Sequence, residues 1–217
     1  MLLEHYVTLW NDNDEDYEKK LKFLDQVWDV LSLSYKNIGG IASMQNKEDL
    51  LDPRMMWKLV TKNGKVLAVN IYKVSGGSRK LCAGGTNGTP EGKEAFYKMC
   101  REEVKRIERN SWGEVSGSME GVFLYKLQAT PIPAETAANI LRDKGKEILN
   151  IDKDGFHYTR NIGGKPYEKI MFGNVPEKYR TKNWNDDSKK YRDTYNKYTS
   201  EHPEEVERRK NAHRNKT

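Results

Sequence analysis

The chain has 217 residues, of which 36% are hydrophobic and 32% charged, and its formal net charge is +6. This length suits one domain with an appendage, and no run approaches the roughly 18 consecutive apolar residues of a membrane helix. The acidic N-terminal segment does not resemble a signal peptide, and Cys82 and Cys100 form neither a disulfide framework nor a zinc motif, so we expect a cytoplasmic protein without a metal site.

Apolar residues recur with two different periods along the chain, and these periods predict strands and helices. Alternation of β-branched and aromatic residues predicts strands, whereas three- and four-residue spacing predicts helices. The expected strands are residues 2–10, 56–60, 66–72, 79–83, 112–115, 156–162 and 167–172. The expected helices are residues 17–35, 96–107, 119–127 and 134–141. This order predicts an α+β fold in which helices flank a mainly antiparallel, twisted sheet.

Pairs of turn-forming residues separate these elements. Asn63-Gly64 and Gly163-Gly164 each stand between two expected strands and predict β-hairpins. Gly76-Gly77 is expected to turn the chain into the strand at residues 79–83, and Gly39-Gly40 is expected to end the first helix.

The C-terminal segment differs in composition from the rest of the chain. Residues 176–217 contain 12 Lys or Arg and 8 Asp or Glu, which is a net +4 (12 − 8), and almost no aliphatic residues. Tyr191, Tyr195 and Tyr198 recur at four- and three-residue spacing, which predicts a helix with one aromatic face. We therefore expect a globular domain at residues 1–175 and a basic helical extension at 176–217, which docks on its own domain or on another chain.

A glycine-rich loop joins the strand ending at Ala83 to the helix after it. Backbone N–H groups in such a loop, with the positive end of a helix behind them, can bind a pyrophosphate, and glycines allow close approach. The alternative is a plain connection whose glycines only end the strand. The candidate cofactor-binding residues are Gly84, Gly85, Gly88, Gly92 and Lys93.

The order of elements resembles that of the GNAT superfamily of N-acetyltransferases over about residues 17–173. That family binds the pyrophosphate of acetyl-CoA at this loop through the signature Q/R-x-x-G-x-G/A. The corresponding residues 87–93 keep two glycines but lack the leading Gln or Arg. The stretches GKEILNIDKDGFHYTRNIGG and EVSG also resemble uncharacterised GNAT-like proteins of tailed bacteriophages. The resemblance implies acetyl-CoA as the cofactor and an amine as the acceptor.

The resemblance also implies an acid for the reaction, and the sequence offers two bases. Residues 123–127, FLYKL, stand where the family has F-Y-x-K-x-G-F, which implies Tyr125 as the acid that protonates the departing thiolate. Glu114, better placed than Glu120, and His157 are the candidate bases for the amine. The structural alternatives are a core aromatic for Tyr125, a surface residue for Glu114 and a hydrogen-bonded strand residue for His157.

Residues 157–160, His-Tyr-Thr-Arg, form the densest polar group on an expected strand. Because side chains alternate along a strand, we expect His157 and Thr159 on one face and Tyr158 and Arg160 on the other.

Three functions stay open from the sequence. The first is an acyl-CoA-dependent N-acyltransferase that acts on an unidentified amine. The second is a catalytically inactive GNAT-like structural or binding component, for instance of a bacteriophage particle, which docks through its C-terminal extension. The third is a nucleic-acid partner that uses the basic clusters of that extension. We expect a protein partner or self-association through the extension before nucleic acid, and no membrane.

Overall fold

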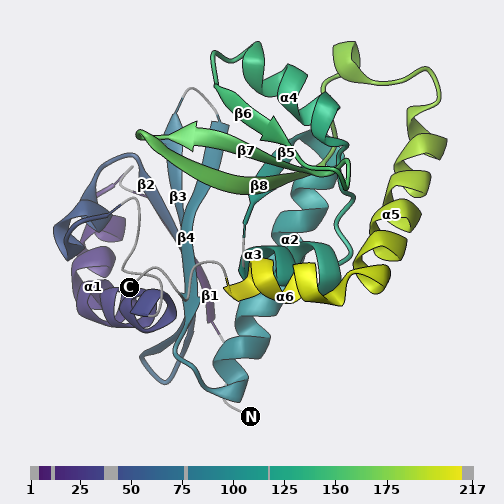
Figure 1. Cartoon of the computed structure of the whole chain (residues 1–217). Coiled ribbons are helices and arrows are strands. Elements are labelled where there is room, and N and C mark those ends of the chain that lie inside the picture. Colours follow the sequence, from purple (N-terminus) through teal and green to yellow (C-terminus); the bar gives the residue numbers. More distant parts are fainter. Residues whose placement is uncertain (1–4, 11–12, 37–43, 76–77, 117, 212–217) are drawn as a thin grey trace. The chain divides into compact units, whose positions relative to one another are not determined.

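The computed structural model describes residues 5–10, 13–36, 44–75, 78–116 and 118–211. These residues fold into two compact units, one running up to Met99 and the other starting at Cys100. Each unit contains one four-stranded sheet, with the orders β1-β2-β3-β4 and β5-β8-β7-β6 (Figure 1), and neighbouring strands are antiparallel. The expected α+β class, with antiparallel strands flanked by helices, is confirmed, but the described strands form two sheets. Within the described ranges, no helix has the length and apolar composition needed to cross a bilayer.

The first unit follows the order strand, helix, three-stranded meander and helix that the sequence predicted. Its elements are β1 (His5–Leu9), α1 (Asp14–Tyr35), the 3-10 helix η2 (Lys47–Leu51), β2 (Met55–Lys62), β3 (Lys65–Ser75), β4 (Ser78–Thr86) and the beginning of α2 (Pro90–Asn110).

The second unit contains one strand, β6, and one 3-10 helix, η4, that the sequence did not predict. Its elements after α2 are β5 (Trp112–Val115), α3 (Ser118–Glu120), the π-helical turn η3 (Gly121–Lys126), α4 (Ala134–Arg142), β6 (Ile148–Ile151), β7 (His157–Ile162), β8 (Lys165–Gly173), η4 (Glu177–Tyr179), α5 (Trp184–Glu201) and α6 (Pro203–Asn211). The strand β6 is short and carries the half-exposed Leu149, so its apolar pattern is weak.

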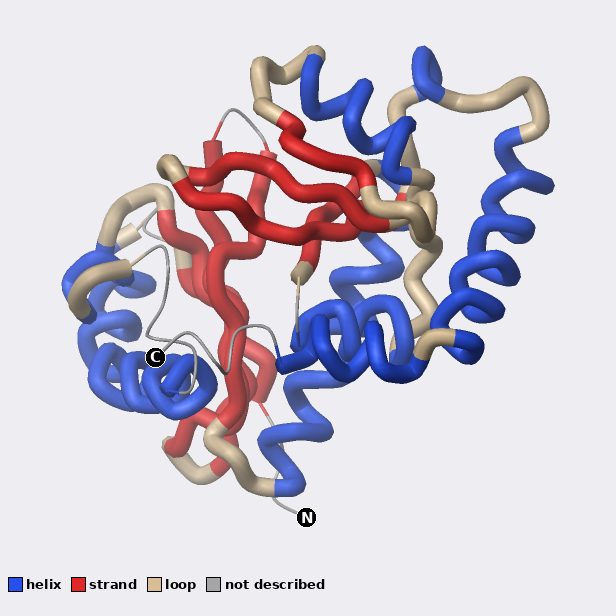
Figure 2. Tube along the Cα trace, in the orientation of Figure 1, coloured by secondary structure: helices blue, strands red, loops and turns tan. Residues whose placement is uncertain are grey.

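Local signals explain how α1 forms and which face it buries. The Asn13 side chain accepts a hydrogen bond from the Asp16 N–H at 2.7 Å, which caps the helix start. Val27 and Leu31 of α1 are fully buried in one core cluster with Trp57 and Ile71 of the sheet. Figure 2 shows α1 lying along one side of the strands of this unit.

The two predicted hairpins are confirmed by their backbone conformation. Asn63 and Gly64 have φ angles of 54° and 72°, and Gly163 and Gly164 have φ angles of 60° and 81°. Two consecutive positive φ angles are typical of the type I′ turn, which matches the twist of paired strands. The pairs Gly39-Gly40 and Gly76-Gly77 lie outside the described residues.

The C-terminal helices α5 and α6 belong to the second unit. Tyr195 of α5 is 1% exposed, and α6 packs along α3 (Figure 1). The division between the two compact units falls after Met99. The predicted aromatic face is present, and it packs on its own unit.

Candidate functional site

The first two candidate glycines lie in a strand and not in a loop. The sequence prediction ended this strand at Ala83, but β4 continues to Thr86 and α2 begins at Pro90, so only residues 87–89 connect them. Gly84 and Gly85 pair in register with Asn70 and Val69 of β3.

Each of these glycines makes room for a neighbour on its own face of the sheet. A Cβ added at Gly84 would lie 2.5 Å from Asn70 Oδ1 and 3.1 Å from the Phe96 ring. A Cβ added at Gly85 would lie 2.9 Å from Ser34 Cβ. The glycines therefore let α2 approach one face and α1 the other, which is a common role of strand glycines.

The outer edge of β4 is covered by the last two residues of α1. The Gly84 N–H donates a hydrogen bond to the Tyr35 hydroxyl at 3.2 Å, and the Thr86 N–H donates to Ser34 Oγ at 3.2 Å. Ser34 Oγ also lies 3.4 Å from the Thr86 carbonyl oxygen, to which it donates. Because β4 is the last strand of its sheet, these are the groups that a further strand would pair with.

The turn into α2 uses its own side chains as caps. Thr89 Oγ1 accepts from the Gly92 N–H at 3.0 Å, and Asn87 Oδ1 accepts from the Thr89 N–H at 3.1 Å. Pro90, whose nitrogen has no proton, occupies the first helical position, where no donor is needed. The helix start is thus capped before any ligand arrives.

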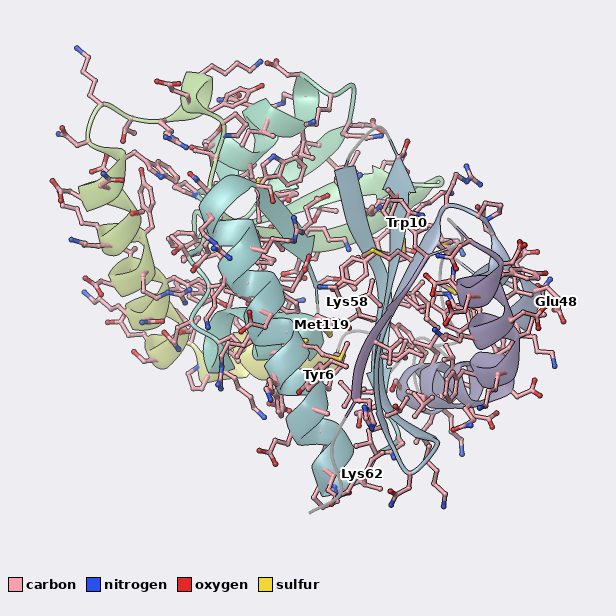
Figure 3. All side chains as sticks on the ribbon, turned by 180° about the vertical axis from the view of Figure 1, so that it is seen from behind. Tyr6, Trp10, Glu48, Lys58, Lys62 and Met119 are labelled. Atoms are coloured by element: carbon pink, nitrogen blue, oxygen red, sulfur yellow. The ribbon has the colours of Figure 1, made fainter. Side chains whose placement is uncertain are left out.

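One backbone donor of this turn stays available within the described structure. This donor is the N–H of Glu91. Every other N–H group of residues 87–93 has a protein acceptor, including that of Gly88, which has φ +83° and donates to Thr86 Oγ1. The Glu91 carboxylate at the beginning of α2 pairs with Lys62 Nζ at 2.6 Å. Lys62 is labelled in Figure 3. Lys93 is exposed in the first turn, as predicted.

Gly92 is required by packing. A Cβ at this position would lie 2.6 Å from Thr86 Oγ1 and 2.8 Å from the Leu67 carbonyl oxygen. A bulky residue here would therefore disturb the strand and the helix together, whether or not a ligand binds.

Glu114, a predicted base, is half of an ion pair. It accepts hydrogen bonds from Arg160 Nε at 2.9 Å and Arg160 Nη2 at 3.0 Å, and from the Tyr158 hydroxyl at 2.9 Å. Tyr158 and Arg160 therefore share one face of β7, as the alternation predicted. Burial, and then the charge of Glu114, raises the pKa of Tyr158. The arrangement holds Glu114 as a bidentate acceptor of the Arg160 guanidinium.

His157, the other predicted base, lies between two carboxylates in the interior of the second unit. Its Nδ1 is 2.5 Å from Asp154 Oδ2 and its Nε2 is 3.1 Å from Glu120 Oε1, and the residue is 1% exposed. Burial by itself lowers the pKa of His157, but the hydrogen bonds to Asp154 and Glu120 outweigh burial and raise it to about 9. The imidazole is therefore protonated at neutral pH, and in that state it cannot accept a proton.

Tyr125, the predicted acid, faces α5. Its ring centroid is 5.9 Å from that of Tyr195, its hydroxyl oxygen is buried, and the hydroxyls of Tyr195 and Thr199 lie beside it. Burial is the largest cause of a raised pKa at Tyr125. Tyr125 and His157 thus both contact Tyr195, whereas Glu114 belongs to the separate ion pair with Arg160.

A buried network that the sequence prediction missed joins α6 to Asp154, one of the two carboxylates that contact His157. Arg209 is 5% exposed and donates from Nε to Glu168 Oε1 at 2.7 Å and from Nη2 to Asp154 Oδ2 at 3.1 Å. In the sequence, Arg209 stands in the basic run Arg208-Arg209-Lys210, a pattern that is typical of a solvated helix face. The available signal was Val206, an aliphatic residue three positions earlier on the same helix face. Within the described part of the chain, no group of three His, Cys, Asp or Glu side chains is arranged to hold a metal ion.

Comparisons with known proteins give structural neighbours only. No family model matches the sequence, and no curated protein matches it. The ribosomal-protein-S18-alanine N-acetyltransferase from Escherichia coli is similar at 14% identity and a TM-score of 0.37, over 81% of this chain and 97% of that one. An N-acetyltransferase from Staphylococcus aureus Mu50 is similar at 12% identity and a TM-score of 0.35, over 78% and 96% of the chains.

Both of these structures are N-acetyltransferases, the class that the sequence resemblance implied.

Proposed function

We propose that this chain is an acyl-CoA-dependent N-acyltransferase of the GNAT type, with its acyl-CoA site along the edge of β4 and the turn into α2. The observation that supports the proposal is the set of outward polar groups on β4. The N–H groups of Gly84 and Thr86 and the Thr86 carbonyl are held by neutral hydroxyls and not by another strand. An amide or carbonyl of a ligand can take the place of such hydroxyls.

The residues of this edge fit the chemistry of coenzyme A. The pantetheine arm contains amides, which can pair with the Thr86 N–H and carbonyl as a strand would. The Glu91 N–H, the positive end of α2 and Lys93 offer attraction for phosphate groups. Acetyl-CoA would supply the activated acyl group. An N–H of β4 directed at the acyl carbonyl would stabilise negative charge on its oxygen.

This proposal assigns binding and carbonyl polarisation to the backbone and Lys93. Glu114, His157 and Tyr125 are engaged in ion pairs, hydrogen bonds or ring contacts inside the second unit. Positioning of the amine beside the carbonyl would then provide most of the rate enhancement, because positioning alone is effective in such reactions.

The experiment is a calorimetric titration of the full chain with acetyl-CoA, followed by a thiol-release assay with a panel of amines. Lys93→Ala should weaken binding about threefold to tenfold, because one charge near a phosphate is lost. Lys80→Ala, an exposed lysine at the other end of β4, is the matched control and should bind like the parent. Absence of acetyl-CoA binding by the parent would overturn the proposal.

The second candidate is a catalytically inactive binding or structural component. The observation that favours it is the engagement of the three predicted acid–base residues, together with the capped start of α2. Binding of acetyl-CoA without thiol release for any amine in the panel would support this candidate. Turnover, even if slow, would exclude it.

A further inference from the structure

Two hydroxyl groups at the end of α1 occupy the positions on β4 that a ligand would need. Resting on the proposed function, we propose that Ser34 and Tyr35 form an internal cap that competes with acyl-CoA for β4 and so sets the affinity of the site. Ser34 bonds to both the N–H and the carbonyl of Thr86, and Tyr35 bonds to the N–H of Gly84.

The spacing of these contacts reproduces the pairing of a strand. Gly84 and Thr86 are two residues apart, and alternate residues of an edge strand direct their N–H and carbonyl groups outward. The hydroxyl of Ser34 acts as both acceptor and donor toward Thr86, as the carbonyl and N–H of a residue on a paired strand would. The cap therefore presents the same hydrogen-bonding pattern as an amide-containing ligand.

The cap depends on a glycine that admits α1 to the strand. A Cβ on Gly85 would lie 2.9 Å from Ser34 Cβ and 3.1 Å from the Val30 carbonyl oxygen, so a larger residue would push this end of the helix away. Leu33, which is 54% exposed, lies against the turn between β4 and α2. Its Cδ2 atom would be 3.4 Å from a Cβ placed on Gly88. Three consecutive residues of α1 thus cover the edge from Gly84 to Gly88.

The cap can be released without dismantling the core. The two N–H contacts to β4 are 3.2 Å long, at the long end of the usual hydrogen-bond range, and the Ser34 Oγ to Thr86 carbonyl contact, at 3.4 Å, is longer than that range. Ser34 is exposed and stands one residue from the end of α1, whereas Val27 and Leu31, which anchor the helix, are fully buried. The last turn of a helix opens more readily than its buried middle.

The first test measures the affinity of the full chain for acetyl-CoA after removal of each hydroxyl. Ser34→Ala and Tyr35→Phe should each tighten binding about twofold to tenfold, because the ligand no longer displaces a hydrogen bond. Ser32→Ala, an exposed serine on the same helix, is the matched control and should leave affinity unchanged. Equal or weaker binding by the double variant than by the parent would overturn the inference.

The second test does not depend on acyl-CoA binding. Amide hydrogen exchange should accelerate at Thr86 in Ser34→Ala and at Gly84 in Tyr35→Phe, while the amides of β3 keep the protection of the parent. Unchanged exchange at both positions would refute the cap itself. If exchange accelerates but neither parent nor variant binds acetyl-CoA, the cap exists and the proposed function fails, so the competition inferred from it fails too.

Discussion

The hydroxyl of Tyr195 donates a hydrogen bond of 2.6 Å to Glu120 Oε1, the oxygen that also lies 3.1 Å from Nε2 of His157. Seventy-five positions separate Tyr195 from Glu120 in the chain. This contact links α5 to α3 in the interior of the second unit. Arg209 links α6 to Asp154, the other carboxylate that hydrogen-bonds to His157.

Replacement of Tyr195 by Phe should destabilise the protein by about 1.5–3 kcal/mol, because a buried hydrogen bond to a charged group is lost while the ring contacts remain. Urea denaturation followed by circular dichroism measures the change. Tyr191→Phe, on the half-buried side of the same helix, is the control and should change stability by less than about 0.5 kcal/mol. Similar losses in both variants would contradict the special role of the Tyr195 hydroxyl.

A chain that stops after Pro176 should not retain a folded second unit. It would leave Glu120, His157 and Asp154 without Tyr195 and Arg209, which complete their buried hydrogen bonds. We expect dispersed NMR signals to be lost for residues after Cys100, or the protein to be insoluble. If the truncated chain has the melting temperature of the parent, residues 176–217 form a separate extension, as the composition predicted.

Stability should fall as the pH rises from neutrality, through deprotonation of His157. The groups facing this imidazole are Asp154 and Glu120, with Tyr195 and Arg209 bonded to the same carboxylates. Its pKa is raised from 6.5 to about 9 in the folded state, so the native protein holds the proton more tightly than the unfolded chain does. The stabilisation is complete below pH 6.5, is lost between about 6.5 and 9, and amounts to roughly 3 kcal/mol.

Thermal unfolding across this pH range tests the assignment. His157→Gln should flatten the decline between pH 6.5 and 9, although the variant starts from a lower stability. His202→Gln, at an exposed side chain, should keep the slope of the parent. A slope that is the same in all three proteins would show that His157 is not the titrating group.

Replacement of Glu114 by Gln should destabilise the second unit on the order of 3 kcal/mol, because Arg160 would be left partly buried without its counter-charge. The side chains of Arg160 and Glu114 are only 11% and 14% exposed, so water compensates little. Glu177→Gln, at an exposed site, is the control. Unchanged stability with a loss of transferase activity would instead favour the base role predicted from the sequence.

The parts of the fold that depend on a few neighbouring residues could be predicted before folding. Asn63-Gly64 and Gly163-Gly164 adopt the left-handed backbone that tight hairpins require, and they do so because Gly and Asn tolerate it. The apolar period predicted α1, and alternation placed Tyr158 and Arg160 on one face of β7. These preferences depend on residues close together in the sequence, so they can be predicted from the sequence alone.

The contacts of the polar residues became clear only from the folded chain. The glycine-rich segment that contains Gly84 and Gly85 has the composition of a phosphate-binding loop. Both glycines are nevertheless strand residues, and their lack of a side chain lets α2 and α1 pack closely against the strand. Arg209 belonged to a basic cluster by composition, yet it is buried on Glu168 and Asp154. The free energy of a charge depends on the groups that surround it after folding, and these come from elements far apart in the chain.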